Sequence, residues 1–175
     1  MDGKSAPAST WQDDLYDLLR SNRITMFAHV PDAGHKRLIE RSLDDPGAVS
    51  VALTTEEEGV ALVAGADLGG ARGVLLMQSS GVGNCINMLS LIKGGGFPLL
   101  TLISMRGEFG EGNPWQFPMG QAVRPVLEAM GVICLAAEAP EEVVPTVSAA
   151  ITMAFQSGQG VAVILTQRLI VAKKL

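Results

Sequence analysis

The sequence predicts an α/β fold, a three-layer sandwich in which helices cover both faces of a six-stranded, mostly parallel sheet. Short runs rich in Val, Ile and Leu alternate with segments of helical character along the chain. Runs that are apolar throughout are typical of parallel strands buried on both faces. A chain of 175 residues is long enough for one domain with a single sizeable core. We expect this domain over residues 10–170, a flexible lead over residues 1–9 and a tail over residues 171–175.

The individual elements follow from apolar runs, capping residues and turn residues. Thr10 is a candidate N-cap for the first helix, and Asp45-Pro46-Gly47 is a turn signal that closes the second. We expect strands at residues 24–29, 49–53, 73–78, 98–104, 132–136 and 161–165. We expect helices at residues 10–22, 33–43, 55–68, 84–93, 119–130 and 141–155. The segment between about residues 105 and 118 is expected to be an irregular loop.

Composition excludes several classes of function. Hydrophobic residues make up 47% of the chain and charged residues 18%, which indicates that much of the chain is buried or that its surface is partly covered by a partner. No apolar run reaches the roughly 18 residues of a membrane-spanning helix, and the N-terminal residues lack the apolar core of a signal peptide. With a net charge of −5 and no basic cluster beyond the C-terminal lysine pair, nucleic acid is not expected as a partner. We therefore expect a cytoplasmic protein.

Neither the cysteines nor the histidines form a recognisable site. Cys85 and Cys134 lie far apart in apolar surroundings and are expected to be reduced, buried thiols. His29 and His35 are the only histidines, and they have no acidic residue at metal-ligand spacing. We therefore expect no metal site in this chain.

Consecutive glutamates open the third predicted helix. Thr55 is a natural N-cap, and Glu58 stands three residues later, where it would complete a capping box. Residues 59–66 contain nothing polar, so the helix is expected to be buried on every side. All of the acids could simply complement the helix dipole, which is worth about 0.3–1 kcal/mol for each. The alternative is that one of them, among Glu56, Glu57 and Glu58, points at a ligand.

This helix resembles the start of the pyrimidine-binding domain of thiamin diphosphate enzymes. In that family a glutamate opens a helix of small residues and contacts N1′ of the aminopyrimidine of the cofactor. The family has small residues two, four and seven positions after that glutamate. Counted from Glu57, these positions are Gly59, Ala61 and Ala64. The resemblance therefore implies Glu57 as the catalytic and cofactor-binding carboxylate, with Glu58 as the alternative.

The glycine-rich segment Ser79-Ser80-Gly81-Val82-Gly83-Asn84 follows the third predicted strand. A strand, a turn of this kind and a helix N-terminus can bind an anion through backbone N–H groups. The segment lacks the Gly-Lys-Ser/Thr of a P-loop and the third glycine of a dinucleotide fingerprint. It is similar to the turn that lines the active-site cleft in sulfopyruvate and phosphonopyruvate decarboxylases. This resemblance implies Ser79 at the substrate, and Ser80, Gly81 and Asn84 at the cofactor.

The long loop after the fourth predicted strand is similar to the same decarboxylases. It carries an Arg-Gly pair and a glutamine before Pro-Met-Gly, and the resemblance implies Arg106 and Gln116 as substrate-binding residues. The alternative for Arg106 is an ion pair with Glu108 or Glu111. The turn Val30-Pro31-Asp32 after the first predicted strand also resembles the first loop of the family. This resemblance implies Pro31 at the cofactor.

One departure from the family decides the expected assembly. Full-length thiamin diphosphate enzymes carry a second domain whose Gly-Asp-Gly motif and downstream Asn bind Mg²⁺ and the diphosphate, and no such motif is present here. The resemblance therefore implies an alpha subunit that needs a diphosphate-binding beta subunit, in an α₂β₂ or larger assembly, with Mg²⁺ held through the partner. The implied reaction is decarboxylation of 3-sulfopyruvate to sulfoacetaldehyde and CO₂. Phosphonopyruvate as substrate, and a non-catalytic regulatory or binding subunit, stay open as alternatives.

Overall fold

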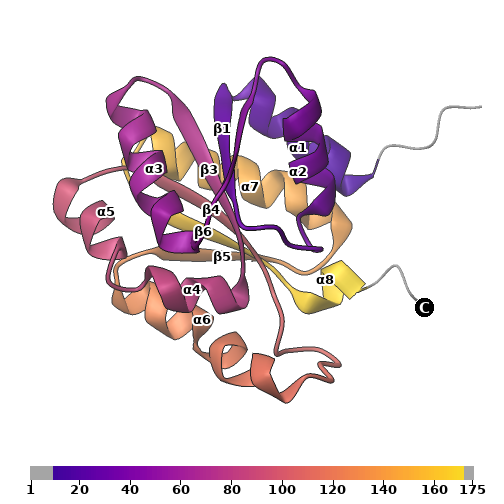
Figure 1. The fold of residues 1–175 in the computed structure, drawn as a ribbon. Helices are drawn as coiled ribbons and strands as arrows, with labels where there is room; N and C mark the ends of the chain where they lie inside the picture. Colours follow the sequence, from indigo (N-terminus) through magenta and orange to yellow (C-terminus); the bar gives the residue numbers. More distant parts are fainter. Residues whose placement is uncertain (1–9, 172–175) are drawn as a thin grey trace, which may run out of the picture.

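A six-stranded sheet forms the middle layer of the computed structural model, and every strand is parallel to its neighbours (Figure 1). The structure describes residues 10–171. The strands are β1 (Ile24–His29), β2 (Val49–Ala52), β3 (Arg72–Gln78), β4 (Leu99–Ser104), β5 (Ile133–Ala137) and β6 (Gly160–Leu165). They lie in the order β2-β1-β3-β4-β6-β5. The predicted sheet is therefore confirmed, and all of its pairs are parallel.

Helices cover both faces of this sheet. One face is covered by α1 (Trp11–Ser21), α2 (Lys36–Asp44), α7 (Pro140–Phe155) and α8 (Gln167–Val171). The other is covered by α3 (Glu56–Leu68), α4 (Ser79–Cys85), α5 (Leu89–Gly95) and α6 (Phe117–Ala129). Because side chains alternate along a strand, Val74 and Leu76 of β3 join the first core, and Leu75 and Met77 join the second. The central strands are thus apolar throughout because both of their faces are buried.

The glycine-rich segment after β3 is a helix, which corrects the prediction of an open turn. Gln78 is the extended N-cap residue, and the chain becomes helical at Ser79. The single helix expected over residues 84–93 is two short helices, α4 and α5. The C-cap of α5 is Gly96, whose φ of 68° is the left-handed conformation that glycine adopts most easily.

The prediction that α3 is buried on every side is wrong for this chain. Ala61, Gly65 and Leu68 lie on one side of the helix at positions i, i+4 and i+7, and all three are exposed. Leu68 is 76% exposed. The helix packs only one side against the sheet, and its outward side is built largely from small residues. The lack of polar residues therefore did not indicate burial here.

Helix ends differ from the prediction in other places. α2 begins at Lys36 and not near residue 33, because the Asp32 carboxylate first accepts the Gly34 N–H in a turn. The loop after β4 contains a short 3-10 helix (Pro114–Gln116) that runs into α6. α8 was not predicted, and the first residue of the predicted tail belongs to it. The predicted lead, residues 1–9, and residues 172–175 of the tail lie outside the described residues.

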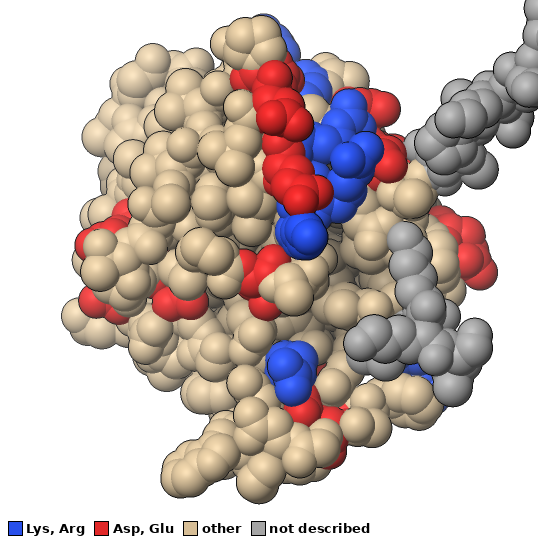
Figure 2. Space-filling model, turned by 45° about the vertical axis from the view of Figure 1, so that its right-hand side comes forward, with Lys and Arg blue, Asp and Glu red and all other residues tan. Residues whose placement is uncertain are grey.

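Charged side chains gather over α1 and α2, whereas much of the same view carries neither acids nor bases (Figure 2). Ion pairs link the two helices, with Arg37 and Asp13 at 2.8 Å and Arg41 and Asp17 at 2.9 Å. Among residues 10–171, no helix is both long and apolar enough to cross a lipid bilayer.

Candidate active site

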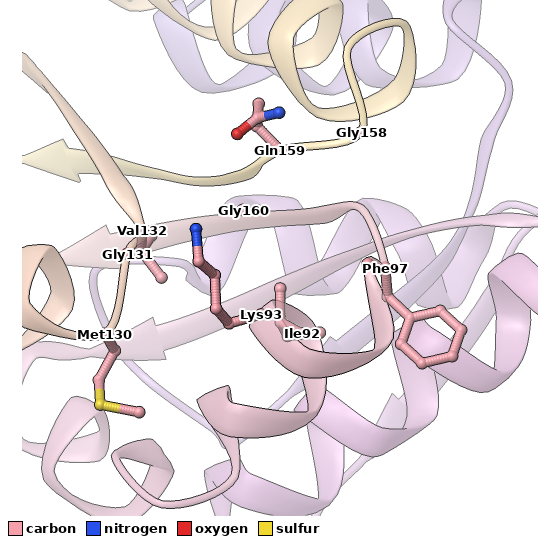
Figure 3. A pocket seen from close by; sticks show the side chains of 10 residues that line it. Ile92, Lys93, Phe97, Met130, Gly131, Val132, Gly158, Gln159 and Gly160 are labelled. Atoms are coloured by element: carbon pink, nitrogen blue, oxygen red, sulfur yellow. The ribbon is translucent and has the colours of Figure 1, made fainter.

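The largest described cavity lies at the carboxyl ends of the strands, where ligands of parallel sheets usually bind. It has a volume of about 730 Å³ and is formed by the last residues of β3 and β4 and by the segments that follow β1, β4 and β6. Its polar lining residues are Asp32, Gln78, Ser104, Arg106, Glu111, Asn113 and Gln167. A second cavity of about 140 Å³ lies near the amino ends of β4, β5 and β6 (Figure 3). Lys93 is the charged side chain in its described lining, and no carboxylate accompanies it.

Glu56 is the glutamate of α3 that reaches another element. Its side chain lies against α4, where Asn84 Nδ2 donates a hydrogen bond of 2.7 Å to Glu56 Oε2. Glu56 is 8% exposed. It can approach α4 closely because residue 81 is glycine, since a Cβ at that position would overlap the Glu56 carboxyl group. A nearly buried carboxylate therefore stands beside the carboxyl end of β3.

The next two glutamates have partners within their own turn. Thr55 Oγ1 donates to Glu57 Oε2 at 3.0 Å, and Glu57 is half-buried. Glu58 is exposed and accepts the Thr54 N–H at 2.9 Å. The expected capping box is not formed, because the Thr55 side chain makes no cap hydrogen bond and Glu58 accepts the N–H of Thr54 and not that of the N-cap residue Thr55. Since successive helical residues point about 100° apart, only one of three adjacent acids can face α4.

Cys85 lies in the core beneath this pair of helices. Burial, and then the charges of Glu56 and Glu57, raise the pKa of the Cys85 thiol to about 12. The thiol is therefore protonated at neutral pH and is not a nucleophile. Both Cys85 and Cys134 are free thiols, as predicted, although Cys134 is only partly buried.

Ser79 joins the start of α4 to the loop after β4. Its buried Oγ accepts the Arg106 N–H at 3.1 Å, so it holds the loop backbone. Ser80 is exposed and its Oγ donates to Gln78 Oε1 at 3.0 Å. The two serines that the sequence grouped together thus have different surroundings, and only the Ser80 side chain is open to solvent.

Arg106 forms a two-pronged ion pair with Glu111. Arg106 Nε and Nη2 donate to the two carboxylate oxygens at 2.6 and 2.7 Å. These hydrogen bonds hold the pKa of Glu111 well below its usual range, and they raise the pKa of Arg106. Both groups are therefore charged at any physiological pH. The alternative of an ion pair for Arg106 is confirmed, with Glu111 and not Glu108 as the partner.

Two glycines allow the Arg106 loop to cross the start of α6. Gly107 has a φ of 77°, and a Cβ there would overlap the carbonyl oxygen of Gln116. A Cβ at Gly120 would overlap the carbonyl oxygen of Arg106. This crossing explains the glycines of the Arg-Gly and Pro-Met-Gly motifs. The Gln116 side chain is not among the described residues that line the cavity, and its buried Oε1 lacks a hydrogen-bond partner.

Asp32 is a charged residue of the cavity that sequence reasoning did not select. Its carboxylate accepts hydrogen bonds from Ser104 Oγ at 2.6 Å, Gly34 N at 3.0 Å and Gln78 Nε2 at 3.1 Å. Pro31, the residue that was selected, precedes it and is exposed. The available signal was the position of an aspartate three residues after the end of a largely buried strand.

Both histidines are buried. His35 Nε2 lies 3.2 Å from the carbonyl oxygen of Met77, and His29 Nε2 lies 3.1 Å from Ser50 Oγ. Burial lowers the pKa of both imidazoles. Among residues 10–171, no group of three or more His, Cys, Asp or Glu side chains is arranged to hold a metal ion.

Solved structures share this fold. The 2-oxoglutarate:ferredoxin oxidoreductase from Magnetococcus marinus has a TM-score of 0.75 and 16% identity, over 93% of this chain and 29% of that one. An X-ray structure from Mycobacterium smegmatis, described as a candidate thiamin diphosphate-dependent enzyme, has a TM-score of 0.70 and 19% identity. That match covers 90% of this chain and 30% of the other. At such identities the likeness concerns the fold alone.

Sequence relatives carry more information, although no family model matches the chain. The sulfopyruvate decarboxylase alpha subunit of Methanocaldococcus jannaschii is 36% identical, over 73% of this chain and 76% of the relative. That of Methanococcus maripaludis is 33% identical, over 86% and 91%. The phosphonopyruvate decarboxylase of Streptomyces viridochromogenes is 35% identical, over 66% of this chain and 30% of that protein. Because the two alpha subunits match over most of both chains, this chain belongs to the family of sulfopyruvate decarboxylase alpha subunits.

Proposed function

We propose that this chain is the alpha subunit of a two-subunit, thiamin diphosphate-dependent decarboxylase that converts 3-sulfopyruvate to sulfoacetaldehyde and CO₂. The identity to two sulfopyruvate decarboxylase alpha subunits carries this proposal. The position of Glu56, nearly buried beside the carboxyl end of β3, supports it independently.

The described residues fit one end of the cofactor. An aminopyrimidine needs a carboxylate that can share a proton with N1′, and we assign this role to Glu56, whose Oε2 accepts a hydrogen bond from Asn84 and whose carboxyl group lies against Gly81. A diphosphate needs a cation with oxygen ligands. Residues 10–171 contain no group of three or more His, Cys, Asp or Glu side chains that could hold one. We therefore assign the diphosphate and its Mg²⁺ to a beta subunit. When bound, the thiazolium of the cofactor supplies the electron sink for decarboxylation.

The residues of this chain have distinct roles in the proposal. Glu56 holds a proton at N1′ of the aminopyrimidine, and Glu57, which the family resemblance implies, is the alternative. Asn84 orients Glu56. The exposed residues Pro31 and Ser80 border the cofactor.

The substrate side of the site is built on the loop after β4. Arg106 presents to the second anion of the substrate the edge of its guanidinium that Glu111 does not use. The Ser79 hydroxyl accepts the Arg106 N–H and so holds the loop backbone in place. The backbone carbonyl group of Gln116 packs against Gly107. In this proposal neither residue needs to touch the substrate with its side chain.

Exposed apolar side chains support a partner subunit. Leu68 and Trp115 are 76% and 88% exposed, and obligate interfaces are rich in such residues. We expect an α₂β₂ or larger assembly in the cytoplasm, where free thiols such as those found here persist.

A second candidate substrate is phosphonopyruvate, which the Streptomyces relative favours. It is also a 2-oxo acid with a second anionic group, so the same cavity suits it. A non-catalytic subunit with the same fold is the third possibility.

Calorimetry and a decarboxylation assay test the proposal together. Thiamin diphosphate and Mg²⁺ are titrated into the chain alone and into its complex with the beta subunit, and the complex is then assayed with 3-sulfopyruvate, phosphonopyruvate and pyruvate. We expect cofactor binding and turnover only in the complex, with 3-sulfopyruvate as the best substrate. Micromolar cofactor binding by the chain alone would contradict the two-subunit site. A complex that binds the cofactor but decarboxylates none of the three acids would contradict the enzymatic role.

A further inference from the structure

Glu111 is the most heavily hydrogen-bonded carboxylate at the cavity. Besides Arg106, it accepts hydrogen bonds from Asn113 N at 2.8 Å, Gln167 Nε2 at 3.1 Å and Gly107 N at 3.2 Å. Its side chain is 2% exposed, whereas that of Arg106 is 39% exposed. A carboxylate with this many donors has one orientation, and it transmits that orientation to whatever is bonded to it.

Glu111 bonds only one edge of the Arg106 guanidinium. Glu111 takes Nε and Nη2, and within the described part of the chain Nη1 makes no hydrogen bond. Arg106 lines the cavity. The planar guanidinium is therefore fixed along one edge, and Nη1 on the other edge is left for a ligand.

We propose that Glu111 is a positioning residue that fixes Arg106 for the second anionic group of the substrate. The inference rests on the proposed function, because it assigns to the same cavity the preference for a substrate with two anions. Arginine loses rotamer freedom when it binds an anion, and an arginine that is already immobilised loses less. Glu111 contributes geometry and not charge, since its own negative charge opposes an incoming anion. Asp32 adds a second negative charge in the cavity, so an Arg106 that is free to turn would be drawn away from the substrate.

The competing explanation is that Glu111 merely holds the loop together. Gln167 separates the two explanations because it ties the same loop to α8 without touching Arg106. Its Nε2 donates to Glu111, its Oε1 accepts Glu108 N at 2.8 Å, and its backbone N–H donates to Glu108 Oε2 at 3.2 Å. Gln167→Leu therefore loosens the loop and leaves the Arg106–Glu111 pair in place.

The experiment uses the complex with the beta subunit and measures kcat and KM for 3-sulfopyruvate and pyruvate. We expect Glu111→Gln to raise KM for 3-sulfopyruvate by about 10-fold, the factor expected for one charge-assisted hydrogen bond. KM for pyruvate and both kcat values should change by less than about 3-fold. Gln167→Leu should affect both substrates alike. Glu128→Gln, which breaks the exposed Arg124–Glu128 pair of 3.3 Å, is the matched control and should change neither.

A binding measurement without turnover completes the test. The unreactive dianion 3-sulfopropionate and the monoanion propionate are titrated into the same complexes by calorimetry. The wild type should prefer 3-sulfopropionate, and Glu111→Gln and Arg106→Lys should each lose that preference. Their double variant should lose little more, because the two residues act as one unit.

The outcomes separate this inference from the proposed function. If Glu111→Gln raises KM equally for both substrates, as Gln167→Leu does, Glu111 only stabilises the loop and the inference is overturned. Turnover of 3-sulfopyruvate without any preference for 3-sulfopropionate also overturns it but leaves the proposed function intact. A preference for 3-sulfopropionate without turnover supports the inference and contradicts the proposed function. If Glu111→Gln does not fold, Glu111→Asp, whose shorter side chain draws back from Arg106 Nε and Nη2, decides the outcome by the same criteria.

Discussion

Replacing Gly81 with alanine is expected to displace Glu56 while leaving the fold intact. A Cβ at position 81 would stand 2.6 Å from Glu56 Cγ, whereas carbon atoms in contact are about 3.5–4.0 Å apart. The Glu56 side chain must therefore move by about 1 Å, and a misplacement of that size near a reacting centre costs about 100-fold in rate. Stability should fall by less than the about 1–3 kcal/mol cost of overpacking, because replacing a helical glycine gains up to about 1 kcal/mol.

Gly83→Ala is the matched control on the same helix. A Cβ there would stand 3.2 Å from Met119 Sδ, and a flexible thioether can give way. Both variants are compared by kcat of the complex, by thiamin diphosphate affinity and by urea unfolding. We expect Gly81→Ala to lose about 100-fold in kcat and Gly83→Ala to stay within about 3-fold. Equal activities in two folded variants would refute the role of the Glu56 carboxyl group.

Three further results are expected. Glu56→Gln should lower kcat by about 100-fold or more, whereas Glu57→Gln should stay within about 3-fold; the reverse ranking in the same assay would favour Glu57 as the residue at N1′. Burial lowers the pKa of His29 and His35 below 6.5, so the unfolded chain takes up protons first on acidification. This contribution to stability is present above the unfolded pKa of about 6.5 and is lost progressively as the pH falls below it; equal urea midpoints at pH 7.5 and 5.5 would contradict this. Gly107→Ala should lower the free energy of unfolding by about 1–3 kcal/mol or more, through its left-handed φ and its overlap with a carbonyl group; unchanged thermal unfolding would argue against the loop crossing.

The sequence by itself determined the sheet, because burial on both faces leaves a direct trace in composition. Every run expected as a strand became one, with ends within one residue. Composition is a weaker indicator of burial for the helices that cover the sheet. α3 is apolar and yet exposed on one side, because small residues are compatible with either environment. α4 was missed because its glycines are typical of a turn, and only the packing of Gly81 against Glu56 and of Gly83 against Met119 accounts for them.

For the candidate site, local sequence patterns located the segments, and tertiary contacts selected the side chains within them. The sequence located the acidic helix start, the segment after β3 and the Arg106 loop, since each is a local pattern at the end of a strand. Only the tertiary structure decided that Glu56, among adjacent acids, faces α4, and that Asp32 meets Ser104 from a distant strand. It likewise selected Glu111 as the partner of Arg106. The physical reason is that helix rotation and loop crossing, which depend on packing between distant segments, set the direction in which each side chain points.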